Sequence, residues 1–119
     1  RSHVAAFRDD LPALMVAADL GVFRAGASVL GEVPAAGLPS ILVPATYAGG
    51  HQRNNARWLG DAGAAVVLEE AEVAALPGRI RELLGEPGRL AAMGDAARAL
   101  ARPDAAGAIA DVVLEVARR

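Results

Sequence analysis

Arg24-Ala25-Gly26-Ala27-Ser28-Val29-Leu30-Gly31-Glu32 is the stretch that decides the fold of this 119-residue chain. It is typical of a strand end, a tight glycine turn and a helix start. A helix amino end built from small residues suits an anionic phosphate, because unpaired backbone N–H groups and the helix dipole point at it. The carboxylate of Glu32, one turn into the helix, is suited to accept from two neighbouring sugar hydroxyls. The stretch therefore suggests a site for a nucleotide diphosphate sugar.

Short apolar runs alternate with helical stretches, which is the pattern of an α/β fold with a parallel sheet and crossover helices. Each expected strand is nearly all apolar, as in strands buried on both faces: Val4–Phe7, Leu20–Phe23, Ile41–Val43 and Ala65–Leu68. The helices expected between them are Leu11–Ala17, Ala27–Ala36 and Gln52–Ala62. After Glu69 we expect the chain to end in several helices, at Glu72–Leu76, Pro77–Leu84, Pro87–Leu100 and Pro103–Ala117. Pro34 lies inside the second helix, where we expect a local distortion.

Composition excludes several functional classes. The net charge of -2 and the lack of a basic face argue against nucleic acid as a partner. No cysteine is present, and the two histidines, His3 and His51, have no acidic cluster beside them, so we expect no metal. The longest apolar runs fall far short of the ~20 residues of a membrane span, and residues 1–10 lack the apolar core of a secretory signal. We therefore expect a soluble, cytoplasmic chain of one domain at most.

Four motifs resemble those of the MurG-type glycosyltransferases of bacterial peptidoglycan synthesis. They are R-A-G-A-S-x-x-x-E from Arg24, G-L-P-S-I-L-V-P from Gly37, H-Q-x-x-N-A from His51 and A-G-A-A from Ala62. Such enzymes transfer N-acetylglucosamine from UDP-N-acetylglucosamine to lipid I, with inversion, and so make lipid II for cell-wall biogenesis. The resemblance runs from about Phe7 to the last helix. It implies that residues 1–119 are part of the second of two Rossmann-like domains (the GT-B architecture), without the acceptor domain and the first strands.

The resemblance also implies roles for single residues. Glu32 accepts from both ribose hydroxyls of the uridine, and Ser28 contacts the diphosphate together with the backbone of Gly26 and Ala27. Val29 stands where family members usually carry threonine, so one side-chain bond to phosphate is missing.

Further roles concern the sugar and the base. The resemblance implies that Gln52 reaches the hydroxyls of the N-acetylglucosamine, with Asn55 close by, and that the backbone at Phe7 and Arg8 reads the uracil edge. His51 stands where a second glutamine is often found.

The residues by themselves leave alternatives open. Glu32 also fits a solvated helix face, although a capping box would require the acid at Gly31. Gln52 and Asn55 share one helix face and also fit a pair of solvent-facing amides. His51 fits either a hydrogen bond to the sugar or phosphate or a surface position. Arg24 fits either support of the loops near the diphosphate or an ion pair with Asp10 or Asp19.

The resemblance places the general base, the acceptor groove and the membrane-docking surface in the domain that this chain lacks. We therefore expect no catalytic residue and no cofactor here, and peripheral association with the cytoplasmic face of the bacterial membrane only through that domain. Helix-end N–H groups stabilise the departing uridine diphosphate without a metal. Two other functions remain: a UDP-N-acetylglucosamine 2-epimerase-like isomerase, and a non-catalytic module that binds a nucleotide sugar.

The expected strands have a consequence for assembly. In the usual strand order 3-2-1-4-5-6 they take places 3, 4, 5 and 6, which leaves the centre of the sheet empty. An exposed central edge invites pairing with another chain. We therefore expect either self-association or a piece of a larger folded protein.

Overall fold

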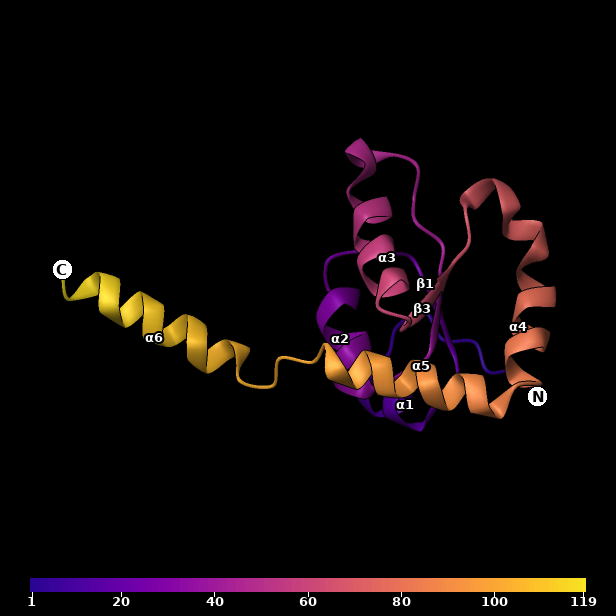
Figure 1. Cartoon of the computed structure of the whole chain (residues 1–119), viewed down its shortest axis with the longest axis horizontal. Coiled ribbons are helices and arrows are strands. Elements are labelled where there is room, and N and C mark those ends of the chain that lie inside the picture. The colour runs from indigo at the N-terminus through magenta and orange to yellow at the C-terminus, as the bar shows by residue number, and fades with distance from the viewer.

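The computed structural model describes residues 1–119, except for the side chain of Ala48. Its centre is a parallel sheet of three strands in the order β1-β2-β3. Figure 1 shows helices arranged around this sheet. The strands are β1 (Gly21–Phe23), β2 (Ser40–Leu42) and β3 (Ala65–Val67). Gly21 lies opposite Ser40, and Ser40 opposite Ala65, so the carboxyl ends of all three strands meet at one edge.

Helices connect and follow the strands. The connecting helices are α1 (Leu11–Ala17) before β1, α2 (Val29–Ala36) between β1 and β2, and α3 (His51–Asp61), with the 3-10 turn η1 (Ala48–Gly50), between β2 and β3. The remaining elements are η2 (Glu70–Ala75), α4 (Leu76–Leu84), α5 (Pro87–Ala99) and α6 (Ala105–Ala117). This arrangement confirms the expected parallel sheet with crossover helices and a helical end.

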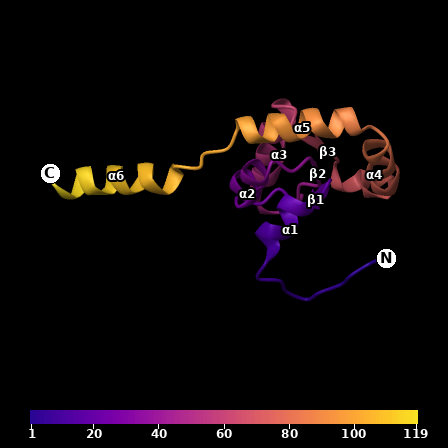
Figure 2. The ribbon, with the colours of Figure 1, turned by 90° about the horizontal axis from the view of Figure 1, so that it is seen from below.

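The strand expected at Val4–Phe7 is wrong. Figure 2 shows this segment running free of the sheet before α1, and its large side chains are open to solvent, with Val4 92% and Phe7 85% exposed. The segment has little to bury, because two alanines separate Val4 from Phe7. The described sheet therefore has three adjacent strands, and the gap that we expected inside it does not arise.

The core lies on both faces of β2, because successive side chains of a strand point to opposite faces. Ile41 packs in one cluster with Leu83 of α4 and Met93 of α5. Leu42 packs in the other cluster with Val33 of α2 and Leu59 of α3. The middle strand is thus covered on both faces, which explains its all-apolar run.

A glycine ends α2 and fixes its packing against α5. Gly37 adopts a left-handed conformation (φ 61), and the N–H groups of Gly37 and Leu38 bond back to Pro34 and Val33 in a Schellman motif. A side chain at Gly37 would lie 2.6 Å from the guanidinium of Arg98. The helix continues through Pro34 and ends at Ala36, directly before Gly37.

The last helix stands apart from the rest of the molecule. Figures 1 and 2 both show α6 extending away from the sheet after residues 100–104. Its apolar side chains, Ile109, Val112, Val113, Leu114 and Val116, are all more than half exposed. No helix in the described chain has both the length and the apolarity to cross a membrane.

Candidate functional site

The carboxyl edge of the sheet carries three loops, which follow β1, β2 and β3. In an open parallel sheet, ligands bind outside the carboxyl ends of the strands. Most of the residues predicted to bind the donor, from Arg24 to Glu32 and from His51 to Asn55, lie in or next to the loops after β1 and β2.

The amino end of α2 presents free backbone amides. The first bonds of this turn run from Val29 N–H to Gly26 O (3.2 Å) and from Leu30 N–H to Ala27 O (3.2 Å), so the amides of Ala27 and Ser28 precede the helical ladder. The Ser28 side chain makes no capping bond and is exposed. A side chain added to Gly26 would meet nothing within 4 Å. The turn thus combines backbone donors that precede the helical ladder with open space around Gly26.

Glu32 lies in the first turn of the same helix and points outward. Val29 and Val33 turn into the core, where both are buried, and this leaves Glu32 on the exposed face. Among the described side chains, none forms an ion pair with Glu32. Val29 belongs to the same buried cluster as Met15 and Val33, so its side chain is part of the core.

Gln52 and Asn55 anchor the loops of this edge. The side-chain oxygen of Gln52 accepts from the Ala45 N–H (2.9 Å), and the amide nitrogen of Asn55 donates to the carbonyl of Ala25 (2.9 Å). The alternative of two solvent-facing amides is therefore wrong. Each amide keeps its other polar atom, Nε2 of Gln52 and Oδ1 of Asn55, for a further partner.

Arg24 reaches across the edge rather than pairing with Asp10 or Asp19. Its guanidinium donates to Glu70 Oε1 (2.7 Å) and, more weakly, to the carbonyl of Val43 (3.4 Å). The hydroxyl of Thr46 donates to Glu70 Oε2 (2.7 Å). The hydrogen bond from Thr46 and then that from Arg24 hold the pKa of the Glu70 carboxyl below its usual value.

Sequence reasoning missed Thr46 and Glu70. The available signal was the pair of acids directly after the last strand, at the edge where Arg24 also emerges. Glu69 takes a different partner, Arg53 (2.9 Å).

The structure does not bring Phe7 and Arg8 to this edge. Arg8 pairs with Asp10, with Nε to Oδ1 at 2.7 Å. The hollow beside Phe7 and Arg8 is lined only by residues between His3 and Leu14. His51 lies exposed at the start of α3.

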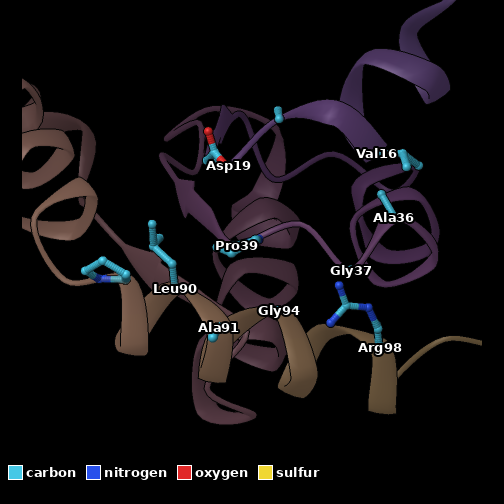
Figure 3. Close-up of a pocket in the computed structure, with 11 residues that line it drawn as sticks. Val16, Asp19, Ala36, Gly37, Pro39, Leu90, Ala91, Gly94 and Arg98 are labelled. Carbon is cyan, nitrogen blue, oxygen red and sulfur yellow. The ribbon is translucent and has the colours of Figure 1, made fainter.

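A cavity of about 320 Å³ lies at the opposite edge of the sheet (Figure 3). Its lining includes Asp19 and Pro39, which precede β1 and β2, and Leu90, Gly94 and Arg98 of α5. None of the predicted site residues lines it. Within the described residues, no group of three or more His, Asp or Glu side chains is placed to hold a metal ion.

Comparison with known proteins identifies the family. Residues 1–109 match the glycosyltransferase family 28 C-terminal domain. A relative from Stutzerimonas stutzeri (strain A1501), named UDP-N-acetylglucosamine--N-acetylmuramyl-(pentapeptide) pyrophosphoryl-undecaprenol N-acetylglucosamine transferase, is 46% identical over 98% of this chain and 33% of its own length. A protein of the same name from Xanthomonas campestris pv. campestris (strain 8004) is 48% identical over 98% of this chain and 28% of its own length.

A solved structure supports the same assignment. The crystal structure of Acinetobacter baumannii MurG superposes with a TM-score of 0.85 at 30% identity, over 95% of this chain and 33% of the other. The chain thus spans about a third of the length of these relatives. On the matched residues and the shared fold, the chain belongs to the glycosyltransferase family 28 C-terminal domain family.

Proposed function

We propose that residues 1–119 are the donor-binding part of an inverting N-acetylglucosaminyltransferase, which moves N-acetylglucosamine from UDP-N-acetylglucosamine to lipid I in peptidoglycan synthesis. The observation that carries this proposal is the open amide turn at Gly26–Ser28 followed, one turn later, by the exposed Glu32. The names of the relatives support the same donor and acceptor.

The proposed donor lies along the carboxyl edge of the sheet. Glu32 accepts from the two ribose hydroxyls, and the amides of Ala27 and Ser28, with the Ser28 hydroxyl, face the diphosphate. Nε2 of Gln52 and Oδ1 of Asn55, the atoms not used to anchor the loops, are the groups offered to the sugar hydroxyls. His51 stands at the start of the same helix as a further donor or acceptor.

In the proposed reaction, the role of this chain is to stabilise the leaving group. When the acceptor hydroxyl attacks the anomeric carbon, negative charge grows on the departing diphosphate. Fixed N–H groups at a helix amino end stabilise that charge without rearranging, because they already point at it. The general base, the lipid I groove and the attachment to the cytoplasmic face of the membrane are assigned to the rest of a longer protein.

Replacement of Glu32 tests the proposal. We expect Glu32→Ala to lower the affinity of the 119-residue chain for uridine diphosphate by roughly 30-fold, because two solvent-exposed hydrogen bonds, worth about 1 kcal/mol each, are lost. Titration calorimetry measures the change. Glu115→Ala on α6, whose carboxylate pairs only with Arg119 at 2.7 Å among the described residues, is the matched control and should leave the affinity unchanged.

An equal affinity of Glu32→Ala and the parent chain would remove Glu32 from the site. In a longer protein that carries this chain, turnover of UDP-N-acetylglucosamine only when a lipid I analogue is present separates the transferase from a 2-epimerase, which needs no acceptor.

A further inference from the structure

One carboxylate ties together the three loops that follow the strands. Glu70 begins η2 in the segment after β3, Arg24 follows β1, and Thr46 lies in the loop after β2. Oε1 of Glu70 accepts from Arg24 and Oε2 from Thr46, each at 2.7 Å. Because each oxygen has its own donor, the carboxylate cannot rotate without breaking its hydrogen bond to one of the two loops.

The Arg24 guanidinium remains available to a ligand. Its side chain is 51% exposed, and its contacts with Glu70 and Val43 leave other N–H donors free. Arg24 also lies two residues before Gly26, in the same loop as the amides of Ala27 and Ser28. Its bonds to Glu70 and Val43 hold the positive charge at the same carboxyl edge as the turn to which the diphosphate is assigned.

We infer that Glu70 is a positioning residue of the donor site. By holding Arg24 and Thr46, it orders the loop before α2 before a nucleoside diphosphate binds. It also keeps the Arg24 cation at the carboxyl edge. The inference rests on the proposed function, because it names how this edge recognises the diphosphate half of the ligand. The lowered pKa of Glu70 is consistent with a carboxylate that stays ionised between these two donors.

Two opposing effects follow from removing the charge of Glu70. An unpaired Arg24 attracts an anion slightly more strongly, but this gain is small because the side chain is exposed and screened by salt. The freed Arg24 side chain and the loosened loop must also be ordered when the ligand binds. This entropic cost is larger than the electrostatic gain. The net effect is weaker binding of the diphosphate.

The test compares uridine diphosphate with uridine on Glu70→Gln. We expect the affinity for uridine diphosphate to fall about three- to tenfold, the cost of ordering one long side chain. The affinity for uridine, followed by NMR titration, should stay at the parent value. A merely structural defect would weaken both ligands and lower the unfolding temperature. This difference between the two ligands is the readout that identifies a positioning role.

The chain offers matched controls for this test. Glu69→Gln changes the neighbouring carboxylate, which pairs with Arg53, and should leave the affinity for both ligands unchanged. Thr46→Val should weaken uridine diphosphate binding in the direction of Glu70→Gln, whereas Thr46→Ser keeps the hydroxyl and should restore parent affinity.

The outcomes separate this inference from the proposed function. Unchanged or tighter binding of uridine diphosphate by Glu70→Gln, with Glu32→Ala still weakened, overturns the role of Glu70 and leaves the proposed function standing. If Glu70→Gln weakens uridine binding as much as uridine diphosphate binding, the positioning role of Glu70 is also overturned. A parent chain that binds neither ligand overturns both.

Discussion

At the scale of single residues, the amides of α3 matter for the shape of the edge before any ligand arrives. Asn55 donates to the carbonyl of Ala25, and Gln52 accepts from the N–H of Ala45. Both bonds are half-buried and cross between elements, so they order the loops after β1 and β2. Under the proposed function, each of these side chains anchors a loop with one polar atom and offers the other to the ligand, which couples folding to recognition.

This coupling leads to a prediction for Asn55→Ala. Loss of the bond to Ala25 leaves a partly buried carbonyl without its partner, at a cost of about 1 kcal/mol, which corresponds to a fall of roughly 4 °C in the unfolding temperature of a domain of this size. Thermal unfolding followed by circular dichroism measures it. Asn54→Ala, on the exposed side of the same helix, is the control and should not move the transition. Equal unfolding temperatures for Asn55→Ala and the parent would contradict the anchoring role.

At the scale of elements, the contact between α2 and α5 depends on two glycines. Gly37 has a positive φ, and a side chain there would collide with Arg98; a side chain at Gly94 would lie 3.0 Å from the carbonyl of Gly37. The helices approach closely at this point because neither residue has a Cβ.

We expect Gly37→Ala to destabilise the chain by about 1–3 kcal/mol, because the left-handed conformation is strained for alanine and Arg98 must move. Chemical denaturation measures the free energy of unfolding. Gly107→Ala, in the exposed helix α6 where an added Cβ meets nothing within 4 Å, should instead be neutral or slightly stabilising. A neutral Gly37→Ala would show that this turn adopts another conformation in solution.

Most of the elements could be predicted from the sequence. The three strands and α1 to α3 could be predicted to within a few residues, because apolar runs and helical periodicity are local properties. The prediction of a strand at Val4–Phe7 was wrong because an apolar run becomes a strand only beside a partner strand. The described sheet offers no partner strand to this segment. Glu70 and Thr46 were missed for a related reason. Their bonds join residues that are 24 and 46 positions apart in the sequence, which no local pattern reveals.

At the scale of the whole molecule, β1 leaves one side of the sheet open. The N–H of Gly21 and the carbonyl of Phe23 bond toward β2, so the polar backbone groups of Val22 point to the other side, where the described sheet ends. Open strand edges pair readily with other chains. The Val22 side chain is 41% exposed on this strand.

We therefore expect the 119-residue chain to self-associate with rising concentration, as measured by sedimentation velocity. Val22→Lys should shift the equilibrium toward monomer, because a charged side chain on an edge strand opposes pairing. Val113→Lys is the comparison, since this exposed apolar residue belongs to α6, which Figure 1 shows extending away from the sheet. Dissociation by Val113→Lys with no effect of Val22→Lys would place the contact on α6 instead.

The most direct measurement of the central claim is an NMR titration of the isotopically labelled chain with uridine diphosphate. If the turn before α2 holds the diphosphate of this ligand and Glu32 holds its ribose, the largest amide shifts will fall on Gly26, Ala27, Ser28 and Glu32. Shifts that leave this turn unchanged and concentrate instead on Gly37 and Gly94, beside the cavity at the opposite edge, would contradict it.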